Sequence, residues 1–277
     1  TQKWTLFPYT TLFRSRGEDA ARKYANHVKE AIEELQKRGI KLAAFIIDTI
    51  VSSSGVVGAP SGYLKMVAKI IHDAGGLFVA DEVQPGFGRT GETFWGFESD
   101  AFLPDIVTMG KPMGNGHPLA ATIIKRNLVE KFAKKTGYFN TFGGNAVSCA
   151  AGMAVMDVIE QDNLQENALS IGKYLKEEIK SLANKYDLIG DVRGKGLFIA
   201  VEMISDCDMT PASEAASSIV QQLKESGVLT NTIGPHSNIL KLRPPMIFSR
   251  ENSDYFLDRF DSILKKNCAN YFNANKN

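Results

Sequence analysis

The chain has 277 residues, of which 44% are hydrophobic and 23% are charged, and its formal net charge is +1 at pH 7. This composition is typical of a globular protein with one large or two medium cores, and it argues against extensive disorder. The near balance of 32 basic and 31 acidic residues gives no electrostatic reason to expect binding to nucleic acid or to a membrane surface.

The three cysteines, Cys149, Cys207 and Cys268, lie far apart, and no pair has the spacing of metal ligands. Such cysteines favour a reducing compartment. No stretch approaches the roughly 20 consecutive apolar residues of a membrane span, and the N-terminus lacks the charged-then-apolar layout of a signal peptide. We therefore expect a soluble, cytoplasmic protein without a metal site.

The segment TLFPYTTLFRS, at residues 5–15, matches in one reading frame the translation of an adapter oligonucleotide used in DNA library preparation. We interpret residues 1–15 as a cloning or assembly scar and leave them out of the fold prediction. On this interpretation the true gene product begins upstream of Arg16. The alternative is a genuine short aromatic strand.

The next elements alternate between helical and strand-like patterns. Apolar residues at helical spacing predict an amphipathic helix over residues 18–39, with Gly39 at its end. The continuous apolar run at residues 41–50 is typical of a strand that is covered on both faces. A second helix is predicted over residues 61–76, with Ser61 as its N-cap and two glycines at its end.

Three further apolar runs, at residues 77–84, 105–111 and 119–125, predict strands. The order strand, helix, strand, strand indicates an α/β domain with a mostly parallel sheet. We assign this large domain to residues 16–160.

The pattern changes after about Gly144. Long helical patterns are followed by strand-like runs and a closing helix, at residues 145–161, 163–186, 188–203, 228–246 and 251–268. We therefore predict a second, smaller α+β domain over residues 161–277, with residues 140–160 as the connecting region.

Two oppositely charged residues follow apolar strand runs. Asp81 ends the run LFVAD, and Lys111 ends the run IVTMGK. Ligands in open α/β sheets bind outside the carboxyl ends of the strands, so we expect the two side chains near each other. A lysine at the end of an interior strand must lose water, which favours its neutral, nucleophilic form. A buried ion pair without a catalytic role is the alternative.

A cofactor with an aldehyde at one end and a ring nitrogen at the other would use both groups, and pyridoxal phosphate is such a molecule. Three segments, ADEVQPGFGRTG (80–91), DIVTMGKPMGNGHPLAA (105–121) and YFNTFGGNAVSCA (138–150), together resemble class III pyridoxal-phosphate aminotransferases of fold type I. The resemblance runs from about Arg16 to Phe256. It implies a large domain with a mostly parallel sheet, here incomplete, and a smaller α+β domain.

The resemblance also implies roles for single residues. Lys111 is the Schiff-base lysine, Asp81 pairs with the pyridinium nitrogen, Val83 lies against the ring face, and Gln84 hydrogen-bonds the ring hydroxyl. Thr141 matches the threonine that reaches the cofactor phosphate of the neighbouring subunit, which implies a homodimer with a shared active site. An ordinary core position remains the alternative for Val83, and an N-cap of the following helix for Thr141. Alternation along an extended chain also places Asp81 and Val83 on one side.

The segment SNILKLRPPM, at residues 237–246, departs from the main pattern of the family. Amino-acid transaminases of this class usually carry an arginine at the place of Lys241, where it binds the α-carboxylate with two parallel hydrogen bonds that lysine cannot copy. Arg243 follows two residues later, on the same face of a strand. This pattern resembles the phospho-lyase branch, which acts on phosphoethanolamine or phosphohydroxylysine, since two cations suit a phosphate dianion. A solvated basic strand edge is the alternative.

Two further residues receive interpretations. Asp48 stands where the family commonly has a glutamate, and we interpret it as a gate that pairs with Lys241 and opens for a carboxylate substrate. His117, in the loop after Lys111, is interpreted as a structural hydrogen-bonding residue rather than a base.

Three functions stay open. The first is a class III enzyme that acts on a primary amine through Lys111 and transaminates it to a keto acid; the second is a phospho-lyase; the third is an inactive fragment or non-catalytic relative. A nucleotide-binding domain would need a glycine-rich turn after the first strand, and residues 48–60 make a poor one.

The family's phosphate-cradling turn and its ring-stacking aromatic residue do not appear before Lys111. We therefore expect the 277-residue chain alone to bind pyridoxal phosphate poorly and to dimerise incompletely.

Overall fold

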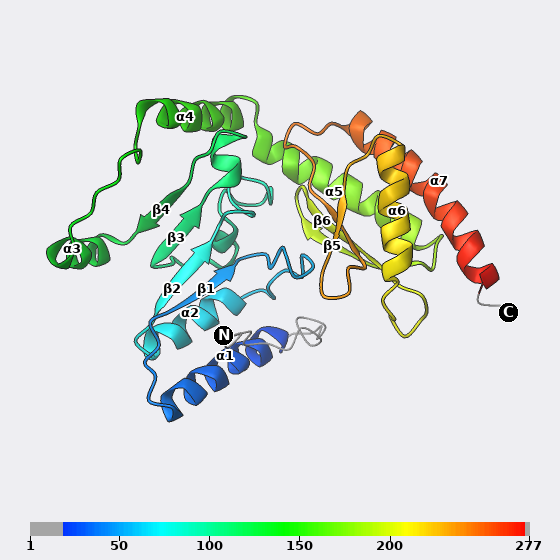
Figure 1. Ribbon diagram of the computed structural model, residues 1–277. Coiled ribbons are helices and arrows are strands. Elements are labelled where there is room, and N and C mark those ends of the chain that lie inside the picture. Colours follow the sequence, from blue (N-terminus) through cyan, green and yellow to red (C-terminus); the bar gives the residue numbers. More distant parts are fainter. Residues whose placement is uncertain (1–18, 275–277) are drawn as a thin grey trace. The chain divides into compact units, whose positions relative to one another are not determined.

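The computed structural model describes residues 19–274, with side chains described as far as residue 268, and Figure 1 traces the chain. The predicted cloning scar at residues 1–15 lies outside the described residues. The described residues form two compact units. The first comprises the chain up to Ile50, Gly58–Phe87 and Thr93–Asp162, and the second comprises Val51–Val57, Gly88–Glu92 and the chain from Asn163 onward.

The first unit contains a four-stranded sheet in the order β1-β2-β3-β4 (Figure 1). β1, β2 and β3 pair in parallel, whereas β4 runs antiparallel to β3. The strands are β1 (Ala44–Asp48), β2 (Leu77–Asp81), β3 (Ile106–Met109) and β4 (Ala121–Ile124). The predicted α/β class with a mostly parallel sheet is confirmed.

The core of the first unit contains two amphipathic helices and the sheet, with α1 packed on α2 and α2 packed on β2. Tyr24 and Val28 of α1, Leu64 and Ile71 of α2, and Phe78 of β2 are all buried in one cluster. The apolar residues of α1 recur at helical spacing, so a single stripe of that helix reaches the core. The helices of the unit are α1 (Ala20–Lys37), α2 (Tyr63–Asp73), α3 (Arg126–Lys135) and α4 (Ala146–Gln161), with the short 3₁₀ helices η1 (Gly96–Asp100) and η2 (Lys111–Gly114).

The start of α2 differs from the prediction. Ser61 is not its N-cap, because the N-cap residue is Gly62, whose φ of 81° lies in the left-handed region. The carboxylate of Asp100 takes the capping role from a distant part of the chain. It accepts hydrogen bonds from the backbone N–H groups of Gly62 and Leu64, both at 2.8 Å. A tertiary contact therefore satisfies donors that a local side chain was expected to satisfy.

The second unit packs helices against an antiparallel sheet in the order β5-β6-β8-β7. Every residue of β6 is buried, and Leu175, Ile219 and Phe260 from three different helices complete the core. This arrangement confirms the predicted α+β class of the C-terminal part. The elements are α5 (Leu164–Ala183), β5 (Ile189–Lys195), β6 (Phe198–Met203), α6 (Ser213–Glu225), β7 (Asn231–Ile233), β8 (Ile239–Leu242) and α7 (Arg250–Ala274).

Two short stretches from the first part of the chain pack with the second unit, which a single division of the sequence near residue 160 does not foresee. The Val51–Val57 stretch is held by Arg193 of β5, whose Nε and Nη2 donate to the Gly55 carbonyl oxygen at 3.0 and 2.8 Å. The same guanidinium forms ion pairs with Asp191 and Glu202 at 2.9 and 2.6 Å. These side chains are mostly buried, so the pairing fixes the arginine in one orientation.

Candidate active site

The predicted acids and the predicted lysine lie at one edge of the first unit's sheet. Asp48, the last residue of β1, is in register with Asp81, the last residue of β2, and Asp81 is in register with Thr108 of β3. Registered residues of neighbouring parallel strands project to the same face of the sheet. Lys111 follows the end of β3 after Gly110. The structure thus brings Asp48, Asp81 and Lys111 to the carboxyl edge, where open α/β sheets bind their ligands.

The surroundings of Lys111 differ from the prediction. Its side chain is exposed, so the expectation that this lysine is stripped of water is wrong for the described structure. The physical reason is that β3 ends at Met109 and Lys111 is already the first residue of the turn η2, beyond the strand. Lys111 also has a φ of 38°, in the left-handed region, which costs an L-amino acid about 1–2 kcal/mol. Strained backbone of this kind is concentrated at functional sites.

Both acids at the sheet edge are fixed by the backbone that follows them. Asp81 Oδ1 accepts a hydrogen bond from the Val83 N–H at 3.0 Å, and Asp48 Oδ1 accepts one from the Ile50 N–H at 3.1 Å. Each acid therefore closes a short turn with its own side chain, as aspartate commonly does at the end of a strand.

Val83 and Gln84 lie in a turn rather than on an extended chain. β2 ends at Asp81, and the Gly86 N–H donates to the Glu82 carbonyl oxygen at 3.1 Å. The argument that alternation places Asp81 and Val83 on one side therefore does not hold beyond the strand. Both residues are half-buried and lie two and three residues after Asp81.

Thr141 lies exposed in the segment before α4 and does not cap that helix. The N-cap is Asn145, whose side-chain oxygen accepts a hydrogen bond from the Ser148 N–H at 3.0 Å, so the alternative role for Thr141 is wrong. His117 Nε2 lies 2.8 Å from Ser148 Oγ, which confirms that His117 forms a structural hydrogen bond. This contact joins the loop after Lys111 to the first turn of α4.

Sequence reasoning missed Glu82, which is fully buried although it follows Asp81 directly. Its Oε1 accepts hydrogen bonds from Thr49 Oγ1 at 2.9 Å and from the Phe97 N–H at 3.0 Å, and its Oε2 accepts one from the Gly96 N–H at 2.8 Å. Burial is the main cause that raises the pKa of Glu82 to about 7, and the nearby carboxylate of Asp48 adds to it. No local pattern marked Glu82, because β2 ends at Asp81 and the donors to its carboxyl group come from Thr49 and the start of η1.

The predicted substrate residues lie in the second unit. Lys241 is a half-buried residue of β8, with its Nζ 5.2 Å from the centre of the Phe198 ring, and Arg243 lies exposed just beyond the strand.

Sequence reasoning missed Arg89, whose Nη1 donates to the Pro244 carbonyl oxygen at 2.8 Å. Burial and next the charge of Arg243 lower the pKa of Arg89 to about 10, so the two arginine side chains lie near each other. Asp48 and Lys241 belong to different units, and their pairing stays a prediction.

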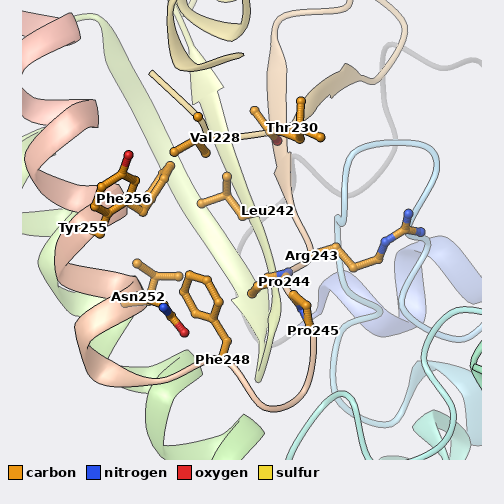
Figure 2. A pocket seen from close by; sticks show the side chains of 13 residues that line it. Val228, Thr230, Leu242, Arg243, Pro244, Pro245, Phe248, Asn252, Tyr255 and Phe256 are labelled. Carbon is orange, nitrogen blue, oxygen red and sulfur yellow. The ribbon is translucent and has the colours of Figure 1, made fainter. Parts of the chain in front are cut away.

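The second unit also contains a pocket of about 280 Å³, shown in Figure 2. The side chain of Arg243 extends away from the other labelled residues, so its charged group does not point into the apolar space (Figure 2). Neither Lys241 nor any predicted residue of the sheet edge lines this pocket. Its lining residues are Leu175, Gly227, Val228, Leu229, Thr230, Leu242, Arg243, Pro244, Pro245, Phe248, Asn252, Tyr255 and Phe256.

Two absences hold within residues 19–274. No group of three or more histidine, cysteine, aspartate or glutamate residues in this part of the chain has the arrangement of a metal site. None of the helices described there is sufficiently long and apolar to span a membrane. The cytoplasmic location stays a prediction.

Open, mostly parallel α/β sheets bind their ligands at the carboxyl edge, which here carries a lysine and an acid. A family model described as aminotransferase class-III matches residues 3–264, and the chain belongs to this family of pyridoxal-phosphate-dependent enzymes of fold type I.

The relatives of this chain include proteins named as aminotransferases and proteins named as phospho-lyases. The chain is 44% identical over 244 residues to "Alanine--glyoxylate aminotransferase 2-like" of Drosophila melanogaster. The aligned residues make up 87% of this chain and 49% of that protein. The chain is also 39% identical over 249 residues to "Ethanolamine-phosphate phospho-lyase homolog 1" of Caenorhabditis elegans. Here the aligned residues make up 88% of this chain and 53% of that protein. A solved phospholyase from Arthrobacter, in complex with phosphoethanolamine, is 40% identical with a TM-score of 0.86, over 89% of this chain and 60% of that one. The chain spans about half the length of the curated relatives it matches.

Proposed function

We propose that this chain is part of a pyridoxal-phosphate-dependent phospho-lyase, which eliminates phosphate from a phosphorylated primary amine such as phosphoethanolamine. Three cations support the proposal: Lys241 in β8 and Arg243 after it lie two residues apart in sequence, and the charge of Arg243 acts on Arg89. Cations donating hydrogen bonds to a phosphate dianion make strong, charge-assisted contacts. The similarity to the Arthrobacter phospholyase supports the proposal.

The residues of the sheet edge fit pyridoxal phosphate. Lys111 offers an exposed primary amine, and Asp81 offers a carboxylate that the Val83 N–H holds in place. When bound, the cofactor supplies an aldehyde that the lysine amine can attack and a ring that accepts electrons. We assign Val83 to the ring face and Gln84 to the ring hydroxyl, because both follow Asp81 in the same turn.

In this proposal each charged residue has a separate role. With pyridoxal phosphate bound, Asp81 would hold a proton at the ring nitrogen, and Lys111 Nζ would remove a proton from the substrate carbon that bears the amine. Lys241 and Arg243 bind the phosphate group that leaves from the neighbouring carbon. We keep Asp48 as the proposed gate residue for an anionic substrate.

Transamination of a primary amine to a keto acid is the second candidate function. The similarity to the aminotransferase 2-like protein of Drosophila melanogaster favours it. Both reactions need the same lysine and the same acid, so the sheet edge is equally suited to either. The substrate-binding residues decide between them.

The test uses the full-length gene product, purified with pyridoxal phosphate and offered phosphoethanolamine. Release of inorganic phosphate without any keto acid supports the phospho-lyase. Formation of pyridoxamine phosphate, with turnover that requires pyruvate or another acceptor, supports the transaminase and overturns the lyase. A protein that shows neither reaction while binding the cofactor contradicts both candidates for this amine.

We also propose a homodimer that forms through α4 and the segment before it. Phe139, Phe142, Val147 and Met153 are between 62% and 85% exposed, and Thr141, which we assign to the partner's cofactor phosphate, lies among them. Exposed large apolar residues that gather along one segment mark an interaction surface. A second copy of the chain is the occupant we propose, because a shared active site would bring Thr141 to it.

Replacing Phe142 or Val147 by aspartate is therefore expected to convert the full-length dimer into monomers, since each change would bury a carboxylate in an apolar interface. Sedimentation velocity gives the oligomeric state. The matched control is Leu229→Asp, which changes a residue of the second unit that is 84% exposed and is expected to leave the dimer intact. An unchanged dimer in the α4 variants, or a monomeric parent protein, contradicts this assignment.

A further inference from the structure

Glu82 joins the segments that follow both acid-bearing strands. Thr49, which donates to it, comes directly after Asp48, and Glu82 itself comes directly after Asp81. The two backbone N–H donors belong to the start of η1. One carboxyl group therefore connects the end of β1, the end of β2 and η1.

The contact with η1 depends on a glycine. A Cβ added at Gly96 would lie 2.3 Å from Thr49 Oγ1 and 3.3 Å from Glu82 Oε1, so no other residue fits there without displacing the hydrogen bonds. The Gly96 N–H can approach the carboxyl group closely only because this position has no side chain. The close approach indicates that the arrangement is built around the carboxyl group.

Glu82 lies among acids. The charged residues of the three segments that it joins are Asp48, Asp81, Glu98 and Asp100. None of the ion pairs within residues 19–274 includes Glu82. A buried carboxyl group without a cation is costly, and an apolar residue would fill the same space without that cost. Three donors that converge on it are what fixes its position.

We propose that Glu82 is a positioning residue, which holds the ends of β1 and β2 in one geometry and so sets the Asp81 carboxylate for a cationic ring nitrogen. The inference rests on the proposed function, because it assigns Asp81 to that nitrogen. Glu82 holds the backbone that follows β1 and β2, and we assign it no contact with the cofactor or the substrate. Its loss is therefore expected to weaken the cofactor contact and slow turnover without changing the binding of the amine.

The test compares Glu82→Gln with Glu98→Gln in the full-length protein. Glu98 is a matched control, because its carboxylate also accepts a hydrogen bond from a backbone N–H of the same segment, that of Trp95 at 3.0 Å. We expect Glu82→Gln to raise the dissociation constant of pyridoxal phosphate about tenfold, because the amide has one acceptor oxygen where the carboxyl group has two, and the Gly96 N–H loses its partner. We also expect it to lower kcat with an unchanged KM for the amine, and we expect neither effect in Glu98→Gln.

Unfolding of the cofactor-free chain gives a readout that does not depend on the proposed function. Because the pKa of Glu82 is raised to about 7 in the folded chain, its contribution to stability is full below the unfolded value of about 4.3 and is lost as the pH rises through 7. The urea midpoint of the parent chain should fall relative to that of Glu82→Gln over this window, since the amide has no proton to lose and all other titrating groups are the same in both proteins.

If Glu82→Gln does not fold, Thr49→Val takes its place, because it removes one donor and keeps the carboxyl group. It is expected to weaken cofactor binding in the same direction and by less. A Glu82→Gln or Thr49→Val protein that loses stability but keeps the parent's cofactor affinity and kcat overturns the inference and leaves the proposed function standing. A parent protein that does not bind pyridoxal phosphate overturns both.

Discussion

Replacing Lys111 by alanine in the full-length enzyme is expected to lower kcat by roughly 10²–10⁴-fold, the range that a positioned acid–base group contributes. In our proposal the amine of Lys111 both holds the cofactor and removes the substrate proton. The same substitution should abolish covalent attachment of pyridoxal phosphate. Borohydride reduction of the loaded protein, followed by peptide mapping, measures that attachment directly.

The control for this substitution is Lys135→Ala, which removes an exposed lysine at the end of α3. It should retain the parent activity and the parent label. A label at any lysine other than Lys111, or full activity of the Lys111→Ala protein, contradicts the assigned role. The exposed position of Lys111 makes the experiment practical, because the change leaves no cavity in the core.

The double substitution of Lys241 and Arg243 by methionine is expected to lower kcat/KM for phosphoethanolamine by roughly 10²–10⁴-fold. Each hydrogen bond to a charged group contributes about 1.5–3 kcal/mol, and the phosphate would lose two such partners. Methionine keeps most of the volume of both side chains and removes only the charge. Steady-state kinetics with increasing concentrations of the phosphorylated amine provide the measurement.

The specificity of that effect is checked with a surface cation from the same unit. Lys173→Met changes an exposed residue of α5 and should leave kcat/KM unchanged. The cofactor affinity of the double variant should also stay at the parent value, since Lys111 and Asp81 are intact. A double variant that eliminates phosphate at the parent rate shows that other residues bind the phosphate group.

The fold was largely predictable because its strands are short apolar runs between turn residues. β1, β2 and β3 all fall inside predicted runs, and the antiparallel partner β4 falls inside the fourth. The helix starts were less predictable. Asp100 caps α2 from a distant position, and no local pattern around Ser61 encodes such a contact.

The candidate site was predictable in its positions and less so in its surroundings. The residues Asp81 and Lys111 stand out because a charge directly after an apolar run is unusual, and the register of the strands brings them to one edge. The exposure of Lys111 was not predictable, because it depends on where the chain leaves the sheet. Glu82 and Arg89 were missed since their partners, Thr49, the start of η1 and the Pro244 carbonyl, are known only from the folded chain.

The second unit contains two stretches from the first part of the chain, and this limits how the protein can be divided into fragments. A polypeptide that begins at Asn163 would contain every helix and strand of the second unit but would lack Val51–Val57. Its Arg193 would then lose the Gly55 carbonyl oxygen, which accepts two of its N–H groups. Neither unit is a single stretch of the gene, so deletion mapping and domain fusion must keep Val51–Val57 and Gly88–Glu92 together with the chain from Asn163 onward.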